Sequence, residues 1–239
     1  MTTDGPMGVY VAEPDRPRGA GVVVIQEVFG VNHHIEAIVD RLAAEGYLAA
    51  APHLFHRTGD PLVDYGDIAA ALPQMGALTA DGLAEDLDAT VALVADTGIA
   101  AARIGVVGFC MGGSVSLFAA TRCDVGAGVG FYGGGITQGR MGLNPLLELA
   151  PSVRVPWLGH YGDADQSIPV DQVEHLRQAL AMAPVPTEIV RYPEAGHAFH
   201  CDERPQAYHE PSARAAWART LEWFGRHLAE NGTPPSGAA

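Results

Sequence analysis

The sequence predicts a single α/β domain: a mostly parallel, twisted sheet with helices on both faces. Short continuous apolar runs, such as 21–25 and 104–107, are typical of strands that are buried on both sides. Segments with apolar residues at helical spacing separate these runs, and strands that alternate with helices form parallel sheets. A chain of 239 residues fits one such domain, and we find no internal repeat and no composition break. The predicted domain covers 1–230, and the Gly/Pro/Ser-rich segment 231–239 is predicted to be a disordered tail.

In the first half of the chain, apolar runs that end at Gly or Pro mark the strands. We expect a short edge strand over 9–13 and buried strands over 20–26, 47–51 and 104–108. Asn32 is expected to cap a helix that ends at Gly46, and a second helix is expected over 81–97. The connection 54–79 is broken by Pro and Gly, and only 67–72 has a helical pattern. Long connections of this kind often form lids or substrate loops.

The second half continues the alternation. Helices are expected over 114–122, 169–183 and 212–229, and strands over 127–132, 155–161 and 187–192. The stretch 133–151 is expected to be irregular.

Composition limits the possible partners. The net charge of −14 and the pI near 4.9 argue against nucleic acids and anionic membranes. The N-terminus lacks the pattern of a signal peptide, and no apolar run approaches the length of a membrane span. Three irregularly spaced cysteines do not form a disulfide framework, which favours a reducing cytoplasm. We expect a monomer that acts on a small molecule.

A strand–turn–helix motif stands at Gly108-Phe109-Cys110-Met111-Gly112. This G-x-C-x-G pattern is a version of the elbow that presents a nucleophile at the end of a strand. The two glycines let neighbouring segments of backbone pass closely. The alternative is that Cys110 is a small buried hydrophobic residue, as isolated cysteines usually are.

Reactive groups also follow three other predicted strands. These strand ends carry Glu27, Asp165 and His197, and parallel strands place such ends at one edge of the sheet, where ligands bind. The chain order of nucleophile, acid and histidine is that of α/β-hydrolases. A thiol needs a base to ionise at neutral pH, and His197 can take and return that proton. Asp165 would orient the imidazole; its spacing from the strand favours it over Asp163.

Backbone donors are expected beside the thiol. The N–H of Met111 starts the helix after the elbow, and that of Val28 directly follows Glu27. We expect these two groups to form an oxyanion hole.

These stretches resemble the dienelactone hydrolase family of the α/β-hydrolase fold. The matching segments are 26–32, 108–113, 131–133, 162–165 and 196–199. The resemblance implies a triad of Cys110, His197 and Asp165, with Glu27 against the thiol. It further implies that Arg57 pairs with Glu27 or with a substrate carboxylate. An incoming anion would then take the arginine and free Glu27 to help deprotonate the thiol.

The chain departs from the family pattern after the histidine. Dienelactone hydrolases carry a second substrate-binding arginine there, whereas Cys201 stands at that position here, and Arg204 comes three residues later. The resemblance therefore does not predict the substrate.

The remaining motifs predict neither a metal site nor a cofactor site. His53-x-x-His56 and His197-x-x-His200-Cys201 lack the second pair of ligands of a structural zinc site, so no metal is predicted. No G-x-G-x-x-G follows a strand, so no dinucleotide and no cofactor are predicted. Tyr132 is expected to line the pocket or the core. Cys123 is expected to be packed and Cys201 to be at the surface.

The prediction is a hydrolase that cleaves an ester or a lactone through a thioester on Cys110. A glutamine amidotransferase is one alternative, although such enzymes use His-x-Glu where this chain has His197-Ala198-Phe199. A non-catalytic binding or regulatory protein on the same scaffold is the other.

Overall fold

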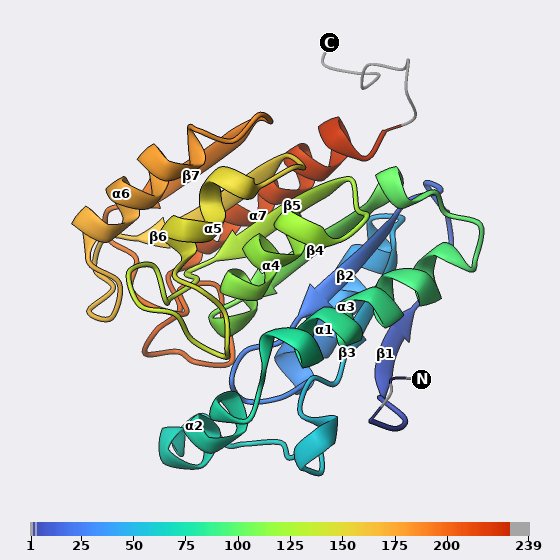
Figure 1. Ribbon diagram of the computed structural model, residues 1–239, viewed down its shortest axis with the longest axis horizontal. Helices are drawn as coiled ribbons and strands as arrows, with labels where there is room; N and C mark the ends of the chain where they lie inside the picture. The colour runs from blue at the N-terminus through green and yellow to red at the C-terminus, as the bar shows by residue number, and fades with distance from the viewer. Residues whose placement is uncertain (1, 3, 230–239) are drawn as a thin grey trace.

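The protein contains one seven-stranded sheet with helices on both faces, seen here in a computed structural model that describes residue 2 and residues 4–229 (Figure 1). The strand order is β1-β3-β2-β4-β5-β6-β7, and only β1 runs antiparallel to its neighbour. The strands are β1 Val9–Ala12, β2 Gly21–Ile25, β3 Leu48–Pro52, β4 Ile104–Phe109, β5 Ala127–Phe131, β6 Trp157–Gly162 and β7 Thr187–Tyr192. The predicted α/β class and all seven predicted strands are confirmed, and the predicted tail at 231–239 lies outside the described residues.

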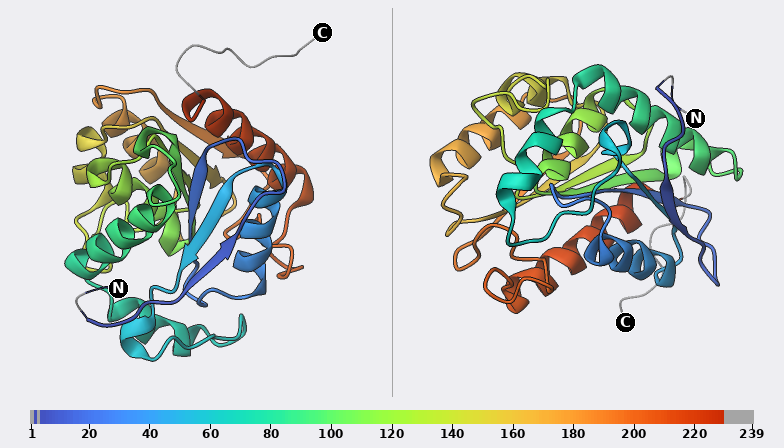
Figure 2. Two further views of the ribbon diagram at one scale, coloured as in Figure 1. Left: turned by 90° about the vertical axis from the view of Figure 1, so that its right-hand side faces the viewer. Right: turned by 90° about the horizontal axis from the view of Figure 1, so that it is seen from below.

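The helices form two layers, one on each side of the sheet (Figure 2). One layer contains α1 (His33–Ala44) and α7 (Glu210–His227). The other contains α3 (Ala80–Ala95), α4 (Met111–Arg122), α5 (Leu146–Leu149) and α6 (Val170–Leu180). Short 3₁₀ turns lie at His56–Thr58, Ala101–Arg103 and Ala150–Ser152.

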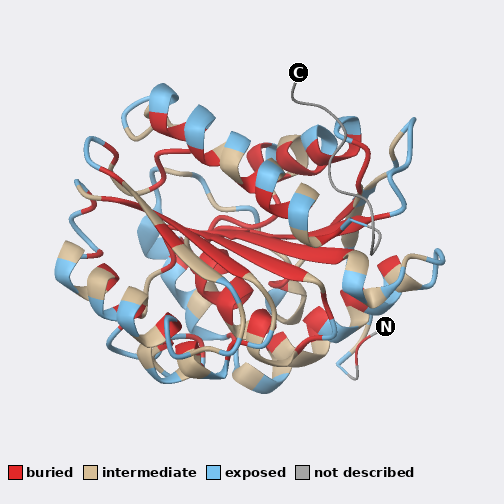
Figure 3. Ribbon diagram, turned by 90° about the horizontal axis from the view of Figure 1, so that it is seen from above, coloured by how far each residue is buried: buried red, intermediate tan, exposed pale blue. Residues whose placement is uncertain are grey.

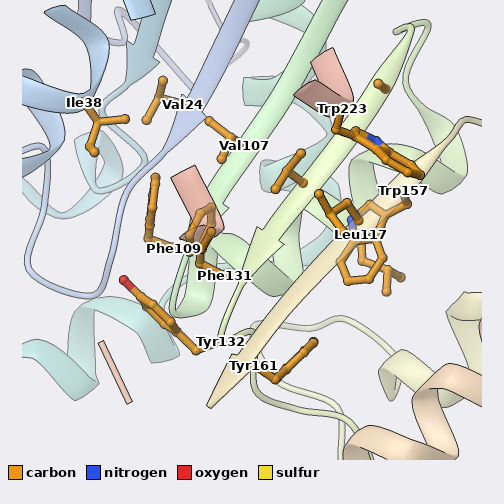
Figure 4. Packing of buried hydrophobic residues seen from close by; sticks show 14 of the residues in the cluster. Val24, Ile38, Val107, Phe109, Leu117, Phe131, Tyr132, Trp157, Tyr161 and Trp223 are labelled. Atoms are coloured by element: carbon orange, nitrogen blue, oxygen red, sulfur yellow. The ribbon is translucent and has the colours of Figure 1, made fainter. Parts of the chain in front are cut away.

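Burial explains why the central strands are continuous apolar runs. Every residue of β2, β4, β5 and β6 is buried, because helices cover both faces (Figure 3). Phe109 and Phe131, at the ends of β4 and β5, stack with their ring centroids 4.7 Å apart (Figure 4). The core thus extends to the edge of the sheet where the parallel strands end.

The segment after β3 contains more helix than the sequence indicates. The helix α2 covers Ile68–Gly76 and runs through Pro73, whereas the pattern predicts helix only over 67–72. Pro73 removes the hydrogen bond to the carbonyl of Ala69, but Ala69 is exposed, so water can satisfy that oxygen. The short helix α5 likewise lies in the stretch 133–151 that was expected to be irregular. Within the described residues, no helix is long and apolar enough to cross a membrane.

Candidate active site

The elbow between β4 and α4 holds Cys110 in a strained backbone conformation. Its φ of 54° and ψ of −116° lie in a region that side-chain-bearing residues rarely adopt. The neighbouring glycines allow this turn: a Cβ on Gly108 would lie 1.9 Å from the carbonyl oxygen of Gly112. A Cβ on Gly112 would lie 2.4 Å from the carbonyl oxygen of Ile25. The predicted elbow is therefore present, and it presents Cys110 at the end of β4.

Cys110, His197 and Asp165 form a hydrogen-bonded row across three loops. Nε2 of His197 lies 3.3 Å from Sγ of Cys110, and Nδ1 lies 2.6 Å from Oδ2 of Asp165. The second carboxylate oxygen of Asp165 accepts hydrogen bonds from the amide and hydroxyl of Ser167, at 2.8 and 2.7 Å. Asp163, two residues earlier, instead pairs with Arg191.

His197 and Asp165 each favour the charged form of the other, as their pKa values show. Burial alone would lower the pKa of His197, but the Cys110 sulfur and the Asp165 carboxylate together raise it to about 10. Burial tends to raise the pKa of Asp165, but hydrogen bonds from His197 and Ser167 outweigh it and place that pKa below its ordinary value. The imidazolium form of His197 is the state that this arrangement favours.

The two backbone donors expected for an oxyanion hole follow the ends of adjacent strands. Val28 follows β2 and Met111 begins α4, next to the thiol. Neither N–H donates a hydrogen bond within the part of the chain that the structure describes. Both are thus free to bind an oxygen.

Glu27 lies after β2 and is 1% exposed. Neither of its carboxylate oxygens has a hydrogen-bond partner among the described residues. Its charge raises the pKa values of Tyr132 and Cys201, after the larger effect of burial. A buried carboxylate without a partner is costly, which points to a functional reason for its presence.

The predicted pairing of Arg57 with Glu27 is wrong. Arg57 donates to both carboxylate oxygens of Asp86 on α3, at 2.7 and 3.0 Å, and to Asp4 at 2.6 Å. Asp86 is fully buried and also contacts His56. Arg57 thereby ties the loop after β3 to α3.

Arg204, and not Arg57, lies beside the aromatic residues Phe29 and Tyr65. Its guanidinium lies 5.5 Å from the ring centroids of both Phe29 and Tyr65. Its Nε is buried and has no hydrogen-bond partner within the described residues. Arg204 lowers the pKa values of Tyr132 and Cys201, which Glu27 raises. The charges of Glu27 and Arg204 thus have opposite effects on the same two groups.

Cys201 is fully buried, so its predicted place at the surface is wrong. Its Sγ lies 3.5 Å from the hydroxyl of Tyr65, which also accepts a hydrogen bond from Asn32. Burial, and after it Glu27, raises the pKa of Cys201 to about 12, so this thiol is neutral. Tyr65 thus joins the loop after β3 to the segment after β7.

Tyr132 directly follows β5 and is fully buried (Figure 4). Its φ is 39°, and its ring centroid lies 5.1 Å from that of His197. Its hydroxyl has no hydrogen-bond partner among the described residues. The ring of Tyr132 thus packs against the ring of His197.

The two histidines within each candidate zinc pair have different contact partners. His53 and His56 contact different carboxylates, those of Asp60 and Asp86. His200 points into an aromatic cluster instead of toward His197. Cys123 is buried, as expected, and burial raises its pKa to about 11.

The sheet, the elbow and the order of the three side chains define an α/β-hydrolase. A sequence profile of the dienelactone hydrolase family matches residues 7–228. The chain therefore belongs to the dienelactone hydrolase family, whose members are hydrolases that act on lactones and esters.

Individual relatives agree with this assignment. A Salmonella typhimurium protein, provisionally named a carboxymethylenebutenolidase, is 43% identical over 95% of this chain and 85% of its own length. The carboxymethylenebutenolidase of Rhodococcus opacus is 32% identical over 93% of this chain and 87% of its own. A crystal structure from Klebsiella pneumoniae, provisionally named a dienelactone hydrolase, has a TM-score of 0.81 and 38% identity. That match covers 94% of this chain and 95% of the other.

Proposed function

We propose that this protein hydrolyses an ester or a lactone through a thioester on Cys110. The observation that supports this most is the hydrogen-bonded row from Asp165 through His197 to the sulfur at the elbow. Asp165 lies 32 residues before His197 in the chain, on the loop after β6. This differs from the His-x-Glu arrangement of a glutamine amidotransferase.

In the proposed reaction, His197 holds the proton of Cys110 and the thiolate attacks the carbonyl carbon. The C=O electron pair moves to the oxygen, which the N–H groups of Val28 and Met111 stabilise. The intermediate collapses, the C–O bond breaks, and His197 protonates the departing alkoxide. Water, deprotonated by His197, then attacks the thioester and releases the acid and the thiol.

In this proposal Arg204 binds the substrate carboxylate, which is the role that the resemblance assigned to Arg57. A carboxylate on the substrate would bind the Arg204 guanidinium, whose Nε lacks a partner among the described residues. Tyr132, with its unpaired hydroxyl, would donate a second hydrogen bond to the substrate. Glu27 would help His197 to hold the proton of Cys110 once a substrate carboxylate has bound to Arg204. If Glu27→Gln left both thiolate formation and turnover unchanged, this role of Glu27 would be excluded.

The test is a panel of neutral lactones, aryl esters and dienelactone, assayed with wild type, Cys110→Ser and Cys110→Ala. We expect turnover by wild type, loss of it in Cys110→Ala, and an acyl adduct on Cys110 in the intact-protein mass spectrum of a slow substrate. Binding without Cys110-dependent turnover of any compound would favour a binding protein on this scaffold.

A further inference from the structure

The segment after His197 has two faces, and only one belongs to the candidate active site. Cys201 and Arg204 lie on the side of Glu27 and Tyr65. His200, in contrast, is 3% exposed and packs against rings on the other side. Those rings are Phe109, Phe131, Trp217 and His34. The second face of this segment therefore points toward the layer formed by α1 and α7.

A cavity of about 340 Å³ lies between α1, α7 and this second face. The two helices run side by side on the same face of the sheet (Figure 2). The side chains at the cavity include Arg41 of α1, His200, Asp202 and Tyr208 of the segment, and Arg214 and Trp217 of α7. None of the residues assigned to the candidate active site lines it.

Two polar groups at this cavity lack partners within the described residues. Arg41 makes no hydrogen bond or ion pair there, and its guanidinium lies 4.2 Å from the centroid of the Trp217 ring. Burial lowers the pKa of Arg41, against the opposing charges of Asp202, Tyr208 and Glu45. His200 is buried, and its Nδ1 has no partner.

The other charged residues of the cavity are already engaged. Asp202 contacts Nδ1 of His34 at 3.1 Å, and Arg214 pairs with Glu210 at 3.7 Å. The positive charge that remains available is that of Arg41. Arg41 is exposed, so water can satisfy its guanidinium, whereas the buried Nδ1 of His200, which lacks a partner among the described residues, is costly unless a ligand completes it.

We propose that this cavity is a second binding site, for a small aromatic monocarboxylate. Arg41 would bind the carboxylate, and the faces of Trp217 and Tyr208 would contact the ring. A volume of about 340 Å³ is at the lower end of the range for small-molecule sites and fits one ring. Asp202 at the same cavity would repel a second carboxylate. The proposal does not depend on the proposed hydrolysis.

Tryptophan fluorescence can test this proposal, with sodium benzoate as the probe. Trp157 and Trp223 are 0% and 3% exposed, whereas Trp217 is only half-buried and lines the cavity. We expect benzoate to change the fluorescence saturably and benzamide, which lacks the charge, to have little effect. Trp217→Phe should remove the signal.

Matched arginine variants locate the bound probe. Arg41→Gln should weaken benzoate binding by about tenfold or more, since a hydrogen bond to a charged group contributes about 1.5–3 kcal/mol. Arg226→Gln, an exposed arginine of α7 that pairs with Glu222, should not change it. Arg204→Gln should also leave it unchanged. Equal binding by Arg41→Gln and Arg226→Gln, or loss of the signal in Arg204→Gln, would overturn the proposal.

Discussion

The guanidinium of Arg57 binds both carboxylate oxygens of Asp86, with Nη1–Oδ2 and Nη2–Oδ1 distances of 2.7 and 3.0 Å. Asp86 is fully buried in α3, and Nε2 of His56 lies 3.1 Å from its Oδ1. The loop after β3, which carries Tyr65 to the site, thus starts from a fixed point on α3. Arg57, which was expected to pair with Glu27 or with a substrate carboxylate, pairs with Asp86 in the structure.

Asp86→Asn should therefore destabilise the protein. The change keeps the shape of the side chain but leaves Arg57 and His56 without a buried charge partner. We expect a loss of about 2 kcal/mol in the free energy of unfolding, less than for a fully buried pair because Arg57 is 22% exposed. Urea denaturation measures it. Asp88→Asn is the matched control, since Asp88 is 56% exposed in its pair with Arg122 and should cost less than about 1 kcal/mol.

Asp165→Asn should lower kcat with little effect on KM. Without the carboxylate, His197 loses the partner that fixes its tautomer and stabilises its charged form, and we expect a fall of about a thousandfold or more. Steady-state kinetics on the best substrate of the panel measures it. Asp163→Asn, two residues away and paired with Arg191, should retain nearly full kcat. Similar losses in both variants would contradict the assignment of Asp165.

Iodoacetamide should label Cys110 well before the other two thiols. The pKa of His197 is raised to about 10, so an imidazolium, which activates a neighbouring thiol, lies beside Cys110 through neutral pH. The pKa values of Cys123 and Cys201 are raised to about 11 and about 12, so both thiols remain neutral. Peptide mass spectrometry follows each site. In His197→Gln the labelling rate of Cys110 at pH 7 should fall by about tenfold or more; an unchanged rate would show that His197 does not activate the thiol.

Arg204→Gln should raise KM for substrates that carry a carboxylate. One lost charged hydrogen bond corresponds to an increase of about 10- to 100-fold, whereas a neutral ester should be nearly unaffected. Comparing kcat and KM for an acid-bearing lactone and its neutral methyl ester measures both effects. Arg57→Gln is the control: if it, and not Arg204→Gln, raised KM for the acid selectively, Arg57 would be the substrate-binding residue after all.

His160 should make the fold sensitive to acid. Burial lowers its pKa to about 3, whereas an unfolded histidine has a pKa near 6.5. Between these values the unfolded chain binds the extra proton, so stability falls as the pH drops from about 6.5 to about 3, by up to about 1.4 kcal/mol per pH unit. Urea denaturation across this range should show a shallower slope in His160→Gln. His175→Gln, at an exposed position, should leave the wild-type slope unchanged.

The parts of the site that could be predicted all follow strand ends. Glu27, Cys110, Asp165 and His197 each lie in the segment that follows a predicted strand, and a parallel sheet brings such positions to one edge. The sequence pattern therefore contained both the residues and the reason for their proximity.

The contacts between loops could not be predicted in the same way. The loop after β3 and the segment after β7 meet at Tyr65, Cys201 and Arg204, about 140 residues apart in the chain. No periodicity in the sequence indicates a contact between these two segments.

The backbone contacts at Gly108 and Gly112 have a consequence for the thiol. Main chain of β4, of the start of α4 and of the end of β2 meet there without any side chain between them. These main-chain contacts constrain the position of the Cβ of Cys110. Serine could replace cysteine at this position and keep the same alignment with His197. The backbone of the elbow fixes the position of the attacking atom, and that atom can be either sulfur or oxygen.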